Sequence, residues 1–512
     1  MKRPEKMGKT MICSTIREIL VQSEQKYKDA DAIRYKTGKN EITAKSYTML
    51  KEDSERFSAV LHELGEQGNH VAVTGMTSYH WLTVYFGTVN SGSTAVPLDV
   101  SLPAEEMCEL IDRADVTVFV IDEIRADVAA IVKSRCPKLK YLISMQKEAH
   151  TEDMLSLEQL MSGQEPGFSF EPSPEDLATI MFTSGTTGKS KGVMLSHRNL
   201  AENATCLDMK FPEHTVLMSV LPVHHAYCLS MDFLKGLSTG AVICINDSLI
   251  RMAKNIKLFK PNVILMVPLM IETLAKKLED AQGLPPEIVK REVFGEQFEF
   301  ICSGGAYLAP SMLDLFGKYG ISILQGYGMT ECSPVISTTV SWNIRKGTVG
   351  QLVPNCEAKT VDEELWVRGS SVMQGYYKMP EETKETLVDG WLRTGDLGYV
   401  DEEGFVYLTG RKKNLIITKN GENVSPEELE NKIGENRLVQ EILVREAEGV
   451  IEAEIFPDYE YAQKKEVADI PAALQKLIDD YNAAAPAYKR VYRLKVRETE
   501  FPKTPSKKIK RY

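Results

Sequence analysis

The chain has 512 residues, of which 43% are hydrophobic and 26% charged, and its formal net charge is −11. This length and composition are typical of a globular protein with about three units of ordinary domain size. Nucleic-acid phosphates require clustered lysine and arginine side chains, so the negative charge argues against a general nucleic-acid binder. The nine cysteines form no C-x-x-C pair, which indicates a reducing compartment and neither a disulfide framework nor a zinc site.

The N-terminal stretch MKRPEKMGKTMICSTIREIL is basic, but its apolar run is too short for a secretory signal peptide. The longest nearly unbroken apolar run, VILMVPLMI at 263–271, is about half the length of a membrane span. We therefore expect a cytoplasmic protein whose membrane contact is at most peripheral.

Short apolar runs alternate with amphipathic stretches up to position 345 of the chain. This alternation predicts parallel sheets covered by helices, which is an α/β fold. The expected strands are 70–75, 94–100, 116–122, 241–246, 262–268 and 298–305, with helices over YHWLTVYFGTVNSG, PAEEMCELIDRAD and HRNLAENATCL.

The pattern changes after that position. The segments EELWVRG, DGWLRTGDLGYV and DEEGFVYLTG are short strands with tight turns, which indicates a small β-rich unit. After Gly410 and Arg411, the stretch NGENVSPEELENKIGEN is typical of a turn, a cap and a helix. We therefore place a domain boundary here, with one domain over 1–411 and another over 412–512.

A loop rich in glycine, TSGTTGKSKG, occupies 183–192. Glycines allow successive backbone N–H groups to point into one concavity, while hydroxyls and lysines add donors and positive charge. The loop is therefore a candidate phosphate cradle, although a plain turn between strands has the same composition. The Walker spacing G-x-x-x-x-G-K-[ST] is not met.

Three motifs do not support the functions that their patterns first suggest, which are a hydrolase, a dinucleotide-binding protein and a zinc site. GLSTG at 236–240 matches a hydrolase nucleophile elbow, but all eight histidines precede Ser238, so no base follows it. GYGMTE has Glu331 where a dinucleotide fingerprint needs its third glycine. His224 and His225 have no third metal ligand at a suitable spacing.

Four further segments share the character of the glycine-rich loop. They are SGGA at 303–306, GYGMTE at 326–331, TGD at 394–396 with Gly410 and Arg411, and Lys508 near the end of the sequence. In this order the set resembles the adenylate-forming superfamily, which comprises acyl-CoA synthetases, luciferases and the adenylation domains of peptide synthetases. The resemblance covers roughly 40–512 and is specific because the segments occur together and in the family order.

The resemblance implies an α/β fold in two parts. A large N-terminal domain of layered α/β subdomains carries a small β-rich unit, and a small mobile α+β C-terminal domain follows a hinge at Lys413. The implied reaction joins a carboxylic acid to ATP, with Mg²⁺, to give acyl-AMP and pyrophosphate. A thiol, that of coenzyme A or of an acyl carrier protein, then accepts the acyl group. Such displacements depend mostly on positioning and electrostatic stabilisation.

Several implied roles concern the nucleotide. Thr330 donates to the α-phosphate, and Glu331 holds Mg²⁺, which prefers oxygen ligands. Tyr327 stacks on adenine and Asp396 accepts from both ribose hydroxyls. The remaining implied nucleotide residues are Thr183, Ser184, Gly185, Thr186, Thr187, Gly188, Lys189, Lys191, Gly304, Gly305, Ala306, Gly326, Gly328, Arg411 and Lys508.

Ordinary structural roles remain open for some of these residues. Glu331 is also suited to a helix N-terminus, Asp396 to a turn and Tyr327 to a core. Lys508 is expected to bridge the carboxylate and the α-phosphate. Lys507 stands where the family usually has glycine, so Lys507 is the alternative if the register is shifted by one.

The acid is constrained by Tyr227, which stands where amino-acid adenylation domains carry an aspartate. Without that aspartate a buried substrate ammonium would be left unpaired, so an α-amino acid is disfavoured. The segments LPVHHAYCLSMDFLKGLSTG and QGYGMTECSPVIS look most like bacterial long-chain fatty-acid–CoA ligases. His225 in L-P-x-x-H, with Tyr227 and Gly326, is implied to lie at the acyl and thiol channels, unless His225 is an ordinary buried histidine.

The identity of the acceptor thiol is indicated by the interval between Glu331 and Asp396. This interval is short and leaves little room for the insertion that carrier-protein ligases of the superfamily contain. Coenzyme A is therefore favoured, with Gly421 approaching the thiol channel. The alternatives are an acyl-AMP ligase that loads a carrier protein, an aryl or other carboxylate–CoA ligase, and a catalytically silent nucleotide-binding relative. The sequence leaves open a monomer or a homodimer.

Overall fold

The computed structural model describes residues 12–146, 154–183, 190–207, 209, 211–281, 283–418, 421–503 and 509–511. The chain divides into two units. The large unit comprises Met1–Ala306, Met312–Ala358 and Val367–Leu392, and the small unit comprises Tyr307–Ser311, Lys359–Trp366 and Arg393–Tyr512. Among the described residues, no helix is both long and apolar enough to cross a membrane.

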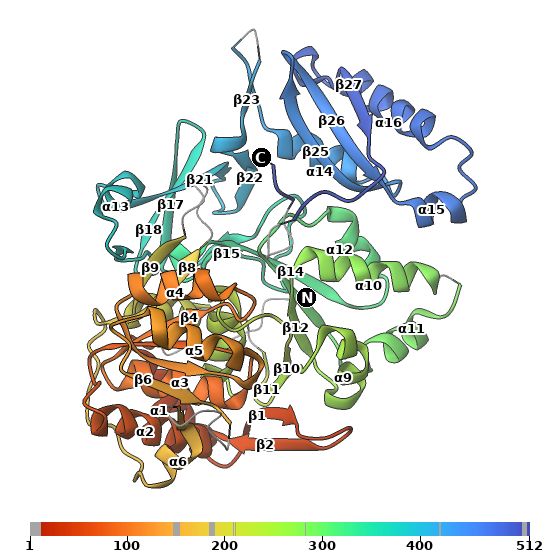
Figure 1. The fold of residues 1–512 in the computed structure, drawn as a ribbon. Helices are drawn as coiled ribbons and strands as arrows, with labels where there is room; N and C mark the ends of the chain where they lie inside the picture. Colours follow the sequence, from red (N-terminus) through yellow and green to blue (C-terminus); the bar gives the residue numbers. More distant parts are fainter. Residues whose placement is uncertain are drawn as a thin grey trace. The chain divides into compact units, whose positions relative to one another are not determined.

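One sheet of the large unit has eight strands in the order β19-β9-β8-β4-β3-β5-β6-β7 (Figure 1). Strands β3 to β8 pair in parallel, and β9 and β19 are antiparallel additions at one edge. Their bounds are β3 His70–Thr74, β4 Thr94–Leu98, β5 Val116–Ile121, β6 Tyr141–Ser144, β7 Leu155–Ser156, β8 Leu177–Thr183, β9 Lys191–Ser196 and β19 Gly375–Tyr376.

Helices cover this sheet because its central strands are apolar on both faces. Helix α4 (Ala104–Arg113) begins after Pro103, as expected, and with α5 (Ala126–Arg135) it packs a buried cluster against β3 to β5. Helix α3 (Tyr79–Asn90) packs on β3 and β4 and is capped by the Ser78 hydroxyl. The other helical segments of this region are α1 Ile16–Tyr27, α2 Tyr47–Glu63, η1 Glu123–Arg125, α6 Leu157–Ser162 and α7 His197–Cys206.

The second sheet of the large unit has nine strands in the order β16-β15-β14-β13-β12-β10-β11-β1-β2. Strands β10 to β14 are parallel, as the alternating pattern predicts. Their bounds are β1 Asp31–Lys36, β2 Ile42–Ser46, β10 Val216–Ser219, β11 Val242–Ile245, β12 Val263–Met266, β13 Phe300–Ser303, β14 Ser322–Gly328, β15 Val335–Thr338 and β16 Gln351–Leu352.

The connections of this sheet are helical. Residues Cys228–Leu234 (η2) form a π-helical segment that continues into α8 (Lys235–Ser238), so Ser238 is the last residue of a helix. The expected strand 262–268 is too long at its end, because Pro268 already starts α10. The other segments are η3 Leu249–Arg251, α9 Met252–Phe259, α10 Pro268–Asp280, α11 Pro286–Val293, α12 Pro310–Gly317 and η4 Thr330–Cys332.

The predicted β-rich region is a sheet of β17, β18, β20, β21 and β22. The division between the units falls within three of its strands, β17 (Cys356–Val361), β18 (Glu364–Gly369) and β21 (Trp391–Val400). The segments EELWVRG, DGWLRTGDLGYV and FVYLTG form β18, β21 and β22, as expected. The remaining elements here are α13 Pro380–Thr386, β20 Leu387–Val388 and β22 Val406–Arg411.

The rest of the small unit is an α+β arrangement, as the resemblance implies. Figure 1 shows its three-stranded sheet, β25-β26-β27, together with α14 and α16. The sheet and the two helices share a buried apolar cluster. Helix α14 starts at Pro426 with two glutamates in its first turn, which suits the positive end of the helix dipole. The elements are η5 Lys412–Asn414, β23 Ile416–Ile417, β24 Asn423–Val424, α14 Pro426–Gly434, β25 Val439–Ala447, β26 Val450–Pro457, α15 Tyr459–Lys464, α16 Ile470–Ala484, η6 Ala487–Lys489 and β27 Arg493–Val496.

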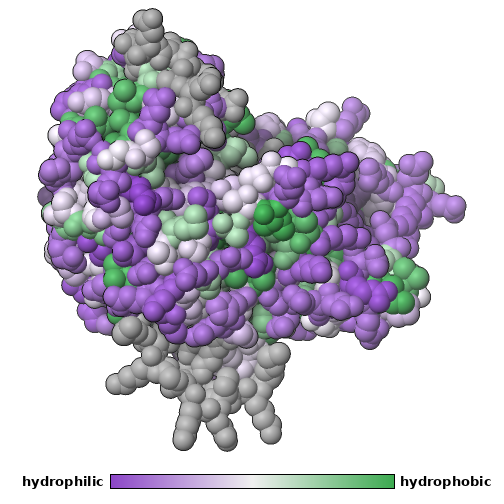
Figure 2. Space-filling view, turned by 90° about the horizontal axis from the view of Figure 1, so that it is seen from below, coloured by the Kyte–Doolittle hydropathy of each residue, from purple (hydrophilic) through white to green (hydrophobic). Residues whose placement is uncertain are grey.

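Hydrophilic side chains dominate the face seen in Figure 2, and hydrophobic ones form small separate patches. Individual apolar side chains are nevertheless well exposed, Ile250 at 97% and Leu249 at 58%. Scattered exposed residues of this kind are normal on a globular protein.

Candidate functional site

The predicted phosphate loop joins two paired strands. Strands β8 and β9 are antiparallel, and Thr183 is the register partner of Lys191, so the two ends of the loop are held side by side. Residues 184–189, which include Ser184, Gly185, Thr186, Thr187, Gly188 and Lys189, lie outside the described residues. Their role as a phosphate cradle stays a prediction.

An arginine that the sequence did not single out holds the base of this loop. The Arg113 Nη2 atom, at the end of α4, donates to the main-chain oxygen of Ser190 over 2.7 Å. Its guanidinium lies 5.6 Å from the centre of the Phe182 ring, on the other side of the loop. Nothing in the sequence around Arg113 marks it, because its contacts join segments about seventy residues apart in the chain.

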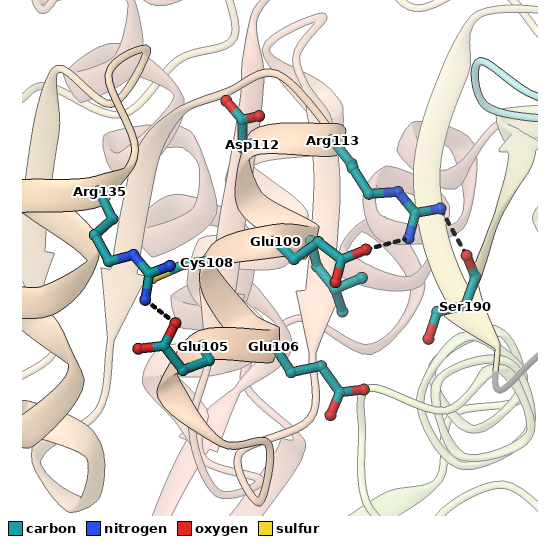
Figure 3. Close-up of a pocket in the computed structure, with 9 residues that line it drawn as sticks. Glu105, Glu106, Cys108, Glu109, Asp112, Arg113, Arg135 and Ser190 are labelled. Atoms are coloured by element: carbon teal, nitrogen blue, oxygen red, sulfur yellow. Dashed lines mark hydrogen bonds and ion pairs between the residues drawn. The ribbon is translucent and has the colours of Figure 1, made fainter. Parts of the chain in front are cut away.

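Figure 3 shows a hollow on α4 that Arg113 also lines. Four carboxylates lie along it, and ion pairs join Glu105 to Arg135 and Glu109 to Arg113. Carboxylates disfavour a polyanion such as a triphosphate, so this hollow does not fit the predicted nucleotide. Its lining residues are Glu105, Glu106, Cys108, Glu109, Leu110, Asp112, Arg113, Arg135 and Ser190, of which Ser190 alone belongs to the predicted phosphate loop.

Two glycine segments end neighbouring strands of the nine-stranded sheet. Gly304, Gly305 and Ala306 follow β13, and Gly326 to Gly328 end β14. The two strands are parallel, with Ser303 opposite Gln325, so both segments lie at the carboxyl edge of the sheet. Ligands of open α/β sheets bind at this edge, and the stacking of adenine on Tyr327 stays a prediction.

Tyr227 contacts the first of these segments, residues 304–306. Its hydroxyl donates to the main-chain oxygen of Cys302 over 3.2 Å. A Cβ atom on Gly304 would lie only 3.0 Å from the Tyr227 ring, so a side chain at 304 would press on this tyrosine. Burial raises the pKa of the Tyr227 phenol well above its usual value, and the hydroxyl therefore stays a neutral donor.

His225 lies beside another imidazole. The rings of His224 and His225 are 4.2 Å apart between centres and are tilted by 49°. Burial lowers the pKa of His224 to about 4, so this ring is neutral near pH 7, although its Nε2 atom is 3.7 Å from the Asp99 carboxylate. His225 therefore has a neutral imidazole ring as its neighbour.

Thr330 and Glu331 form a short 3-10 turn directly after β14. The main-chain oxygen of Glu331 accepts from Met373 N over 2.9 Å. The Glu331 carboxylate accepts, through Oε1, from the Tyr376 hydroxyl over 2.8 Å. The Lys191 ammonium lies 4.6 Å from the centre of the same Tyr376 ring. The structure thus brings two predicted site residues, Glu331 and Lys191, to one tyrosine that the sequence had not indicated.

The side chains near Glu331 are better suited to a magnesium ion that binds together with the nucleotide than to a metal ion held permanently by the protein. Within the described part of the chain, no three His, Cys, Asp or Glu side chains gather as a metal site. Mg²⁺ commonly takes one or two carboxylates and completes its shell with phosphates and water. One carboxylate is enough for such an ion, and the role of Glu331 as that ligand stays a prediction.

In the small unit, the predicted ribose residue Asp396 is paired with Arg411, another predicted nucleotide residue. Asp396 on β21 is the register partner of Arg411 on β22. The Arg411 Nε atom lies 2.7 Å from Asp396 Oδ1, and the aspartate side chain is only 6% exposed. The strand register, not the TGD motif, brings this cation to the carboxylate.

The predicted hinge follows at once. Lys413 lies in the turn Lys412–Asn414 after β22, and burial, followed by the nearby Arg411 and Arg511 charges, lowers the pKa of its ammonium. Gly421 has a φ of +80° in the turn before β24, a conformation that favours glycine. Lys508 and Lys507 lie outside the described residues, and the role of either stays a prediction.

Comparison with known proteins agrees with this arrangement. Residues 20–377 match the AMP-binding enzyme family, and residues 413–512 match the AMP-binding enzyme C-terminal domain. The long-chain-fatty-acid–CoA ligase of Salmonella typhimurium is 27% identical over 78% of this chain and 77% of its own length. A probable CoA ligase of Humulus lupulus, CCL5, is 31% identical over 71% of this chain and 69% of its own.

A solved structure covers still more of the chain. ATP-bound MatB from Rhodopseudomonas palustris superposes with a TM-score of 0.81 at 25% identity, over 97% of this chain and 96% of its own. The resemblance deduced from five short motifs is thereby confirmed at the level of family and fold. The chain belongs to the AMP-binding enzyme family and is an AMP-forming acid–thiol ligase.

Proposed function

We propose that the chain activates a medium- or long-chain fatty acid with ATP and passes the acyl group to coenzyme A. In the first half-reaction a carboxylate oxygen attacks the α-phosphorus, and pyrophosphate leaves with the electron pair of the broken P–O bond. In the second, the sulfur of the thiol attacks the acyl carbon, AMP leaves, and the thiol proton passes to solvent.

The contact between Tyr227 and Gly304 is the observation that supports a fatty acid as the substrate. The phenol hydroxyl is engaged by the Cys302 carbonyl, so this side chain offers its ring to the carboxyl edge of β13. It supplies no negative charge to a substrate ammonium, whose burial without a partner would be costly. An acid with an apolar body suits such a wall better than an α-amino acid.

The names of two relatives support the acceptor. The enzymes from Salmonella typhimurium and Humulus lupulus are both named CoA ligases. We assign the phosphates to the loop 183–192 and to Thr330, the magnesium ion to Glu331, and the ribose to Asp396 and Arg411. Magnesium, when bound, neutralises phosphate oxygens.

Two half-reactions with different needs can share one site if a small domain moves between them. We propose that residues 412–512 turn about Lys413, with Lys508 serving acyl-AMP formation and Gly421 serving thioester formation. Gly421 has a left-handed φ and, as a glycine, no side chain that could obstruct the thiol.

Two assays on the purified chain test the function. ATP–pyrophosphate exchange is measured with straight-chain acids of graded length, an aryl acid and an amino acid, and thioester formation is measured with free coenzyme A. The proposal expects exchange and thioester with fatty acids. Exchange without a CoA thioester would indicate a carrier-protein ligase, preference for the aryl acid would change the substrate class, and no exchange with any acid would indicate a catalytically silent relative.

A further inference from the structure

Strand β19 fixes a tyrosine beside β9, the strand that follows the predicted phosphate loop in the chain. Tyr376 pairs with Val193 of β9 in antiparallel register. On either side of it, Gln374 N donates to Met194 O over 2.9 Å and Tyr377 N donates to Gly192 O over 2.8 Å. The main chain at Tyr376 is therefore held to the strand that leaves the loop.

The side chain of Tyr376 is equally fixed, with only 5% of the residue exposed. Its hydroxyl donates to Glu331 Oε1 over 2.8 Å, and the Lys191 ammonium lies 4.6 Å from the ring centre. A tyrosine hydroxyl carries its proton at neutral pH, so it acts as the donor in this hydrogen bond.

Both partners of this tyrosine have long, flexible side chains. A glutamate or lysine that must meet a metal ion or a phosphate loses conformational freedom when it does so. A hydrogen bond to one carboxylate oxygen, and a ring face under an ammonium, restrict each side chain before the ligand arrives. The donor is uncharged, so the carboxylate keeps the negative charge that attracts a cation.

We propose that Tyr376 is a positioning residue for acyl-AMP formation. Its hydroxyl orients Glu331 toward the magnesium ion, and its ring orients Lys191 toward the nucleotide phosphates. This inference rests on the proposed function, because it takes from there the roles of Glu331 and Lys191.

The first test is Tyr376→Phe, with Tyr377→Phe as the matched control. Phenylalanine keeps the ring and loses only the hydroxyl, so the half-saturating Mg²⁺ concentration for pyrophosphate exchange should rise roughly tenfold, as for other groups that support a metal ligand. The KM for ATP at saturating Mg²⁺ should change little. The Tyr377 hydroxyl bonds Asp115 over 2.6 Å instead, and its loss should leave the Mg²⁺ curve in place.

A binding measurement separates positioning from turnover. Mn²⁺ affinity is measured by electron paramagnetic resonance with a non-hydrolysable ATP analogue present, and thermal unfolding checks that each variant is folded. Tyr376→Phe should weaken Mn²⁺ binding by roughly tenfold. In the Glu331→Gln background the same change should have no further effect, because the carboxylate it orients has been removed.

The ring has its own test. Tyr376→Leu removes both contacts and should also raise the KM for ATP at saturating Mg²⁺, and this extra effect should vanish in the Lys191→Met background. Three results would each overturn the inference. They are equal shifts of the Mg²⁺ curve in Tyr376→Phe and Tyr377→Phe, additive effects of Tyr376→Phe and Glu331→Gln, and absence of Mn²⁺–nucleotide binding by the parent chain. If the parent binds Mn²⁺ and nucleotide but exchanges pyrophosphate with no acid, the proposed function fails while the Tyr376–Glu331 coupling can still be measured.

Discussion

Two carboxylates assigned to ATP have opposite surroundings in the two units. In the large unit, Glu331 accepts a hydrogen bond from the neutral Tyr376 phenol. In the small unit, Asp396 is almost completely buried and lies against the Arg411 guanidinium at 2.7 Å. A neutral donor orients a carboxylate and leaves its charge for a cation, whereas a guanidinium neutralises that charge and fixes the group as a hydrogen-bond acceptor. The first arrangement suits a metal ligand and the second suits a ribose contact.

The largest expected effect would separate the two half-reactions by two residues of the small unit, Lys508 and Gly421. Lys508→Ala should slow acyl-AMP formation by roughly 10²- to 10³-fold, the size expected when one charge-stabilising group is lost. Conversion of supplied acyl-AMP to acyl-CoA should be nearly unchanged. Each half-reaction is measured separately.

The reciprocal variant, Gly421→Trp, should slow thioester formation while pyrophosphate exchange continues. If both variants slow both half-reactions equally, the small domain does not alternate. A defect in Lys507→Ala in place of Lys508→Ala would move the tail register by one residue.

The next effect tests the Glu331 side of the comparison. Glu331→Gln keeps the size and removes the charge, so pyrophosphate exchange at limiting Mg²⁺ should fall by about 10- to 100-fold. Raising Mg²⁺ should restore part of the rate, because mass action fills a weakened site. Superimposable Mg²⁺ titrations of the variant and the parent would make Glu331 an ordinary residue of its 3-10 turn.

The Asp396 side should respond differently. Asp396→Asn weakens a charged acceptor, whose hydrogen bonds are worth about 1.5–3 kcal/mol, so the KM for ATP should rise by roughly tenfold or more. The Mg²⁺ titration should keep its midpoint, in contrast to Glu331→Gln. A shifted Mg²⁺ midpoint with an unchanged KM for ATP would exchange the two assignments.

A third carboxylate, that of Asp232, accepts a hydrogen bond from a thiol, which is a weak donor. Asp232, in the π-helical segment of the large unit, accepts from the Cys228 thiol over 3.4 Å, and burial raises the pKa of its carboxyl to about 7. The ordinary value is about 3.9, so between about pH 4 and 7 the folded chain holds a proton that the unfolded chain has lost.

The large unit should therefore lose stability as the pH rises through that window, by at most about 1.4 kcal/mol per pH unit. Asp232→Asn cannot ionise and should remove the difference. Urea denaturation of both proteins at pH 4.5, 5.5, 6.5 and 7.5 measures the slope. Parallel curves for parent and variant would mean that Asp232 is ionised in the folded chain.

The sequence alone determined the fold class and the family. The buried strands β3, β5 and β12 are short apolar runs bounded by turn residues, and such runs are recognisable because both faces of a parallel strand must be apolar. Local chemistry also located the glycine segments at 304–306 and 326–328, because only small residues allow a ligand to approach the main chain. Strand β2 (Ile42–Ser46) was missed, since its side chains are partly exposed at a sheet edge and carry no apolar run.

The tertiary structure decided which side chains meet. Tyr376 and Glu331 are 45 residues apart, and Arg113 and Ser190 are 77 apart. The approach of Arg411 to Asp396 depends on a strand register that includes an irregularity between Leu397 and Gly398. Short motifs indicate which side chains contact the ligand, because those side chains must be of the types that the reaction requires. The residues that hold those groups in place act through packing and register, which depend on the whole fold and leave no local pattern in the sequence.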